Sequence, residues 1–318
     1  MKLIRLLPIA LVPVLVQCGG EARPIQSAQA APQVSASASA AAPAPARTYP
    51  IRMHWAHRVG VRTHAILDDD KRDQTVTRLP GQPANKSDKV THAHLDGTLI
   101  VQEVDDKENA RRTEIVVNEV WQTTGDGARV VLAPAGAHLM VTRAARRQDA
   151  QVTSNGQPAS KELRDAMDGL LTLSIGGPTD DEVFGTAEPQ AVGAEWGVNS
   201  AVAQKDLSDK GIVAGGMTGK VKLAGTERVR DVECLDLRVE FTVSGIESVS
   251  DLPPGSIVES GAVDAHMRGL FALSGNLARL GEEMETSTRM KVRVPTPQGN
   301  VQIDVKAYDR QRASYAPP

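Results

Sequence analysis

Residues 233–243 read ECLDLRVEFTV, a stretch in which apolar and polar side chains alternate. Successive side chains of an extended strand point to opposite faces, so one face of this stretch is apolar. That face carries Leu235, Leu237, Val239, Phe241 and Val243. A period of two is typical of an antiparallel strand that buries one face against a core. The stretch therefore predicts a β-sheet protein.

The same alternation recurs along most of the chain after residue 50. Apolar residues alternate with polar ones over 289–294 and 301–306, and the sequence PTPQGN at 295–300 between them has turn-forming residues, which predicts a hairpin. Shorter alternating stretches occur at 113–121, 128–132, 137–143 and 217–223. A turn containing glycine is expected after the last of them, at 224–226. The pattern predicts a mainly β fold of antiparallel sheets, arranged as two similar β-rich halves or as one curved half-barrel.

One segment has a helical period instead. After Ser160, a favourable N-cap residue, apolar side chains recur at the spacing of one helix face. They are Leu163, Ala166, Met167, Leu170 and Leu171. This predicts one helix near 160–173 that covers a face of the sheet. Residues 274–285 are compatible with a second helix or with a hairpin that turns at Ser274-Gly275-Asn276.

The N-terminus has the features of an export signal. Lys2 and Arg5 precede an apolar run over 6–16 that is too short to span a membrane. The run ends at Leu15-Val16-Gln17-Cys18, which resembles the lipobox of bacterial lipoproteins, whose cysteine is acylated after cleavage. This resemblance implies a signal peptide over 1–17 and a lipid anchor on Cys18, with Gly19 favouring the outer membrane. The alternative is an ordinary secretory signal cut after Ala28-Gln29-Ala30.

The segment after Cys18 separates the anchor from the folded part of the chain. Residues 18–50 are rich in Ala, Ser and Pro and hold few large apolar side chains, which predicts a flexible tether. The predicted organisation is then a first β-rich half with the helix at 51–185 and a second β-rich half at 186–318.

Two motifs in the middle of the chain resemble a known group of proteins. They are PTDDEVFG, from Pro178 to Gly185, and a P-x-x-V-G-x-x-W pattern from Pro189 to Trp196. The chain resembles a group of uncharacterised exported bacterial lipoproteins in these residues. The resemblance implies a β-rich cell-envelope lipoprotein in two similar halves, and it implies no activity.

Composition and charge exclude some function classes. Aromatic residues make up 3% of the chain, and the formal net charge is −3, so there is no stacking surface or basic patch typical of nucleic-acid binding. The chain has two cysteines. If Cys18 carries lipid, Cys234 has no disulfide partner in the chain, and its alternating context predicts a buried residue in a strand rather than a catalytic thiol.

Candidate catalytic and metal-binding groups are few. His92 and His94 are two residues apart and would share one strand face, but no third ligand is evident, so exposed histidines are expected. Alanine at both should then change stability by no more than about 0.5 kcal/mol. The acidic runs at 68–70 and 179–182 lack calcium-loop spacing and are predicted to be solvated loops. No common catalytic or nucleotide-binding motif is present, so neither an enzyme nor a cofactor is predicted.

Three function classes remain. The first is a lipid-anchored module that binds or carries a hydrophobic small molecule. The second is a structural or assembly lipoprotein that contacts another envelope protein through its surface. The third is a hydrolase with unrecognised residues. For the first class, the expected cavity would lie between the helix and the strand. Its predicted lining is Leu163, Met167, Leu170, Leu235, Leu237, Val239 and Phe241.

Overall fold

The computed structural model describes residues 47–54, 56–145, 149–273 and 279–317. These residues form a mainly β structure of antiparallel sheets with three helices. The expected mainly β fold is therefore confirmed. The predicted signal peptide, Cys18 and most of the tether lie outside the described residues. No helix in the described part of the chain is long and apolar enough to cross a membrane.

Thirteen strands form one sheet, which is not closed into a barrel. Its long strands are β2 (Arg62–Arg78), β3 (Asn85–Val104), β4 (Ala110–Thr124), β11 (Ile212–Val229), β12 (Val232–Val249), β13 (Ile257–Ala272), β14 (Arg279–Thr296) and β15 (Gly299–Ala316). Its short strands are β5 (Val130–Ala133), β6 (His138–Thr142), β7 (Gln151–Ser154), β8 (Gln157–Pro158) and β10 (Glu195–Gly197). The order is β10-β11-β12-β13-β14-β15-β2-β3-β4-β6-β7-β8, with β5 beside β4. Two further short strands, β1 (Thr48–Tyr49) and β9 (Gln190–Ala191), pair separately.

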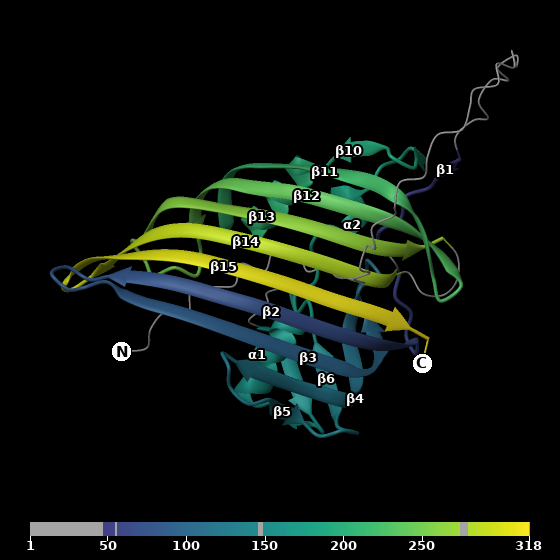
Figure 1. Ribbon diagram of the computed structural model, residues 1–318, viewed down its shortest axis with the longest axis horizontal. Coiled ribbons are helices and arrows are strands. Elements are labelled where there is room, and N and C mark those ends of the chain that lie inside the picture. The colour runs from purple at the N-terminus through teal and green to yellow at the C-terminus, as the bar shows by residue number, and fades with distance from the viewer. Residues whose placement is uncertain (1–46, 55, 146–148, 274–278, 318) are drawn as a thin grey trace, which may run out of the picture.

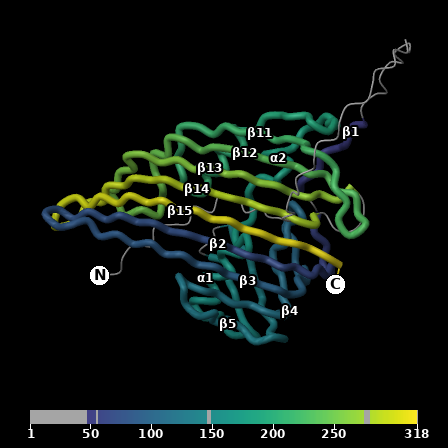
Figure 2. Tube along the Cα trace, in the orientation of Figure 1, coloured from purple at the N-terminus to yellow at the C-terminus, as the bar shows by residue number. Residues whose placement is uncertain are grey.

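The pairing of β15 with β2 joins the two parts of the chain into one sheet. The two strands are antiparallel along residues 302–316 and 64–78, and Asp309 is the partner of Lys71 in this register. Figure 1 shows them side by side in the middle of the curved sheet. The β2–β3 and β14–β15 hairpins reach the same end of the molecule (Figure 2). Of the two arrangements expected from the sequence, one continuous sheet is observed.

Helix α1 (Lys161–Leu170) is the helix that the sequence predicts near 160–173. The Ser160 hydroxyl accepts a hydrogen bond of 3.2 Å from the backbone N–H of Leu163, which caps the first turn. Leu163, Ala166, Met167 and Leu170 are buried, as their spacing predicts. The helix packs against β2, β3 and β5.

Two helices were not expected from the sequence. Helix α2 (Asp180–Phe184) begins in the acidic run at 179–182, so the prediction of a solvated loop there is wrong. Thr179 and Glu182 form a capping box, in which each side chain accepts a hydrogen bond from the other residue's backbone N–H. Helix α3 (Ser200–Asp209) packs against β11 and α2.

Three other local expectations are corrected or resolved. The acidic run at 68–70 lies within β2 and not in a loop. The turn expected at 224–226 is absent because β11 continues to Val229, with a bulge between Leu223 and Gly225. From Arg279 onward the undecided segment is strand β14, whereas Ser274-Gly275-Asn276 lies outside the described residues.

The buried apolar side chains form two large clusters on the side of the sheet that faces the helices, called the inner face below. Cluster 1 combines β11–β15 with α2, α3 and residues near the start of the described chain, including Met53. Cluster 2 combines β2–β7 with α1 and also takes Ala313 from β15. The division into halves at 51–185 and 186–318 stays a prediction, although the two clusters follow it approximately.

Candidate functional site

The residues predicted to line a cavity are all buried, but they divide between the two clusters. Leu235, Leu237, Val239 and Phe241 belong to cluster 1. Leu163, Met167 and Leu170 belong to cluster 2. The structure therefore does not bring the helix residues and the β12 residues together in one cluster, because α1 covers β2 and β3 rather than β12. The apolar ligand cavity itself stays a prediction.

Methionine is prominent among the buried side chains of the inner face, although the three phenylalanines also belong to cluster 1. The chain has eight methionines and three phenylalanines. The buried methionines are Met53, Met167, Met217, Met267, Met284 and Met290. Met267 and Met284 are direct partners across β13 and β14. Methionine side chains are flexible and adapt to irregular apolar shapes, so this part of the inner face can rearrange around different apolar groups.

The helices contact two separate regions of this face. Helix α3 packs against β11 at one end, and α1 packs against β2 and β3 nearer the other. An extended segment also covers part of the inner face, because Tyr49, Ile51 and Met53 are buried in cluster 1. The middle of the inner face, on β13–β15, thus lies between these main helix contacts.

A group of polar side chains interrupts the apolar inner face where β14, β15 and β2 adjoin. It comprises Asp69, Thr286, Asp309 and Gln311, and we call it the inner polar cluster. Thr286 is the strand partner of Asp309, and Gln311 is the partner of Asp69. The Gln311 amide donates a 2.9 Å hydrogen bond to the carbonyl of Gly169 in α1. The sequence does not indicate this cluster, because the run of acidic residues at 68–70 is typical of a solvated loop, whereas it lies in β2.

Glycine at position 169 allows α1 to lie directly over Asp69. A Cβ atom there would collide with Oδ2 of Asp69, so any other residue requires the helix or the carboxyl to move. Asp69 is only 5% exposed. Burial, and then the facing carboxyl group of Asp309, raise the pKa of Asp69 well above its ordinary value. The raised pKa favours a protonated Asp69 that shares its proton with the facing carboxyl group of Asp309.

Arg279 connects several elements at another edge of the inner face. Its guanidinium pairs with Glu282, whose side chain is fully buried, and with Asp180 of α2 at 2.9 Å. It also donates to the carbonyl of Met53 at 3.4 Å and lies over the ring of Phe271. A single cation thus links β13, β14, α2 and the extended segment near residue 53.

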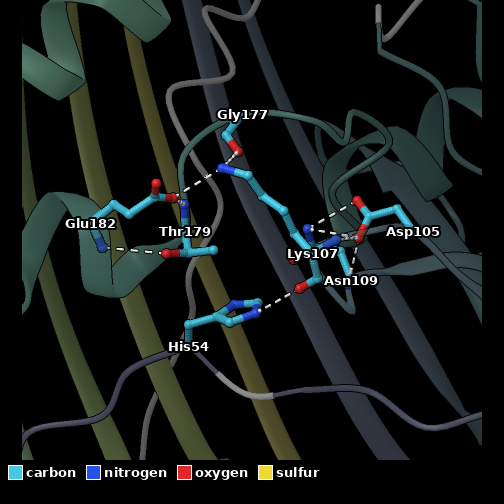
Figure 3. Close-up of polar contacts among 7 residues, drawn as sticks. All are labelled: His54, Asp105, Lys107, Asn109, Gly177, Thr179 and Glu182. Atoms are coloured by element: carbon cyan, nitrogen blue, oxygen red, sulfur yellow. Dashed lines mark hydrogen bonds and ion pairs between the residues drawn. The ribbon is translucent and has the colours of Figure 1, made fainter.

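A second polar network fixes the β3–β4 turn to the segment before α2 (Figure 3). The Lys107 ammonium donates to the carbonyl of Gly177 at 3.3 Å and pairs with Glu182 at 3.0 Å. The carbonyl of Lys107 lies 3.1 Å from Nε2 of His54. The Asp105 carboxylate accepts hydrogen bonds from the backbone N–H groups of Lys107 and Asn109, which shapes the turn. This network is structural in character, since each residue drawn in Figure 3 forms at least one hydrogen bond or ion pair with another residue of the chain.

The histidines at 92 and 94 are not simply exposed, contrary to the expectation from the sequence. The register of β2 and β3 places an aspartate opposite each. His92 Nδ1 lies 2.5 Å from Asp70, and His94 Nδ1 lies 2.8 Å from Asp68. Both rings also contact Trp121. Among the described residues, no group of three or more His, Cys, Asp or Glu side chains is placed to hold a metal ion.

The double replacement of His92 and His94 by alanine should lower the unfolding free energy by about 1–2 kcal/mol, because it removes two cross-strand pairs and two ring contacts. Urea denaturation measures the difference. The exposed His138, paired with Glu114 at 2.7 Å, supplies the control, and His138→Ala should cost less than about 0.5 kcal/mol. Equal losses in the two variants would contradict this prediction.

Cys234 is buried in β12, as the sequence predicts. Burial, followed by the charge of Glu227, raises the pKa of its thiol to about 11. A thiol in this environment is a poor nucleophile at neutral pH. It therefore packs as a small apolar side chain beside Leu270 and Leu280, on the face of the sheet opposite the inner face.

An open hollow of about 630 Å³ lies on that opposite face, across β11–β15. Most of its lining is polar or charged, including Lys220, Glu240 and Arg289. Of the seven residues predicted to line an apolar cavity, only Phe241 borders it. This hollow therefore differs in chemistry from the predicted cavity.

Comparisons with known proteins do not assign the chain to a family. No family model matches it, and no curated protein is significantly similar to it. Among solved structures, a LolA superfamily protein from Nitrosomonas europaea is 10% identical. The match covers 82% of this chain and 86% of that one, with a TM-score of 0.15. At this TM-score the likeness supports no conclusion about fold or function.

Proposed function

We propose that this protein is a lipid-anchored protein of the cell envelope that binds a hydrophobic ligand against the inner face of its sheet. The supporting observation is the methionine-rich middle of that face, around Met267, Met284 and Met290, between the main helix contacts. The proposal contains no catalytic step and no cofactor. Its partners are the membrane, through the N-terminal lipid, and an apolar small molecule.

The physical reason is the match between alkyl chains and this surface. Burying apolar area stabilises a complex by about 25 cal/mol per Å². Methionine and valine side chains offer such area without the fixed shape of aromatic rings, which suits a flexible ligand. A sheet that is not closed into a barrel also leaves edges at which a ligand could enter.

Replacing Cys18 with serine should release the protein from membranes, because the predicted acyl chains attach to that sulfur. Membrane fractionation and labelling with a radioactive fatty acid measure the change. Cys234→Ser is the matched control and should leave both membrane partition and labelling unchanged. A Cys18→Ser protein that stays labelled and membrane-bound would contradict the lipid anchor.

Ligand binding is tested with the full chain carrying Cys18→Ser, so that no covalently attached acyl chain competes. An environment-sensitive fluorescent fatty acid should bind saturably and be displaced by extracted envelope lipids. Met284→Gln, which keeps the length of the side chain but makes the inner face more polar, should weaken binding about tenfold. Met140→Gln on β6 is the control, since Met140 is half-buried and lies on the face of its strand opposite the cluster 2 residues Leu139 and Val141.

The result of the probe assay separates a ligand-binding protein from a structural or assembly lipoprotein. Saturable binding that Met284→Gln weakens supports the ligand-binding proposal. If neither the fatty acid nor a fluorescent alcohol of the same chain length binds the folded chain, the proposal is wrong, and a structural or assembly role at the surface becomes the better interpretation.

A further inference from the structure

The inner polar cluster is unusual because it places several hydrogen-bond acceptors inside an otherwise apolar face. Asp69 and Asp309 face each other, and no N–H or hydroxyl group in the described chain donates to Oδ1 of Asp69. Thr286, beside Asp309, is only 7% exposed. Its hydroxyl also has no hydrogen-bond partner among the described residues. Buried polar atoms without partners cost stability, so their retention calls for an explanation.

Resting on the ligand-binding function proposed above, we infer that the inner polar cluster binds the primary ammonium group of an amphiphilic ligand. A primary ammonium has three N–H donors and one positive charge. The oxygens of Asp69, Asp309 and Thr286 offer acceptors, and the two carboxyl groups offer the negative charge. The ammonium then takes the place of the proton that the two carboxyl groups otherwise share.

The surroundings of the cluster suit the rest of such a ligand. Met284 and Met290 lie on the same face of β14 as Thr286, two residues before it and four residues after it. An alkyl chain attached to the ammonium would therefore lie against methionine side chains. Asp309 and Lys71 are partly exposed, whereas Asp69 and Thr286 are buried. The ammonium would enter from the side of Asp309.

Other head groups fit this cluster less well. A carboxylate or phosphate would meet the negative charge of the aspartates, which is unfavourable at short distance. A quaternary ammonium has the charge but no N–H donor, so it would lack the hydrogen bonds. Lys71, the strand partner of Asp309, places one positive charge nearby and should compete with a bound ammonium.

Competition among head groups of equal chain length tests the inference. The fluorescent fatty acid bound to the full Cys18→Ser chain is displaced with dodecylammonium, dodecyltrimethylammonium, dodecanol or dodecanoate. Dodecylammonium should displace the probe at about one-tenth of the dodecanol concentration, consistent with charge-assisted hydrogen bonds in a buried site. Dodecyltrimethylammonium should lie between the two, and dodecanoate should not surpass dodecanol.

Substitutions in the inner polar cluster test whether this cluster causes the preference for dodecylammonium over dodecanol. Asp309→Asn should reduce the preference for dodecylammonium over dodecanol to about twofold or less, and Lys71→Met should increase it. Asp304→Asn is the matched control, because Asp304 lies on the same strand but its side chain pairs with Arg78 on the opposite face. Thr286→Val keeps the side-chain shape and should weaken the preference about threefold, which provides a second test if Asp309→Asn does not fold.

Each result has a distinct meaning. If dodecanol displaces the probe and dodecylammonium does so no better, the ammonium site is wrong while ligand binding stands. If the preference persists in both Asp309→Asn and Thr286→Val, the ammonium binds elsewhere, and the inference is also wrong. If neither this probe nor a fluorescent alcohol of the same chain length binds, the proposed function itself fails.

Discussion

Replacement of Arg279 by alanine should lower the unfolding free energy by about 3–5 kcal/mol, the range found when one partner of a buried ion pair is removed. Glu282 would keep a fully buried carboxylate without its cation. The variant also loses the ion pair with Asp180 and the hydrogen bond to the carbonyl of Met53. Equilibrium denaturation in urea, followed by far-ultraviolet circular dichroism, measures the loss.

Two further variants separate the buried charge from other effects. Adding Glu282→Gln to Arg279→Ala should recover more than half of the loss, because the amide needs no counter-charge. Arg289→Ala on the same strand is the control, since Arg289 is 71% exposed and pairs with Asp264 at 3.4 Å. It should cost less than about 0.5 kcal/mol. If Glu282→Gln gives no recovery, the buried carboxylate is not the cause.

Replacement of Asp69 by asparagine should raise stability at pH 8 by about 1–2 kcal/mol and have little effect near pH 4. Burial and Asp309 raise the pKa of Asp69 in the folded protein, so the folded state holds a proton that the unfolded state releases. The stability that Asp69 contributes is therefore complete below its unfolded pKa of about 3.9 and is lost as the pH rises through the folded value. Asparagine does not titrate and can still donate a hydrogen bond to Asp309.

Urea denaturation at pH 4, 6 and 8 measures this difference. The gap between Asp69→Asn and the unaltered protein should widen as the pH rises. Asp304→Asn, which removes an aspartate whose pair with Arg78 is on the opposite face, should show no such widening. A constant gap across the three pH values would mean that the Asp69 carboxyl does not titrate differently on folding.

The fold class could be predicted from sequence because alternation is a local property. The β12 pattern and the 160–173 helix depend only on spacing, and both are observed. Helix α2 could also have been predicted, since Thr179 and Glu182 have the spacing of a capping box. It was missed because its five residues are too few to show a helical period.

The candidate site was harder to predict because it depends on long-range pairing. Nothing near Asp69 in the sequence indicates that Asp309 and Gln311 lie beside it, 240 or more residues later. A run of three aspartates also resembles a loop, although in β2 the side chain of Asp69 faces inward while those of Asp68 and Asp70 pair with histidines. The same limit explains why α1 was expected over β12 and instead lies over β2 and β3.

The pairing of β2 with β15 has a consequence for how the protein folds. The seam of the sheet forms between residues 64–78 and 302–316, so the chain must close a loop of more than two hundred residues. Contacts so distant in sequence slow folding, because the entropy of closure is lost before the pairing compensates for it. Until closure, β2 and β15 are both long unpaired edges, which other chains could join. We therefore expect slow, concentration-sensitive refolding, with aggregation competing against closure of this seam.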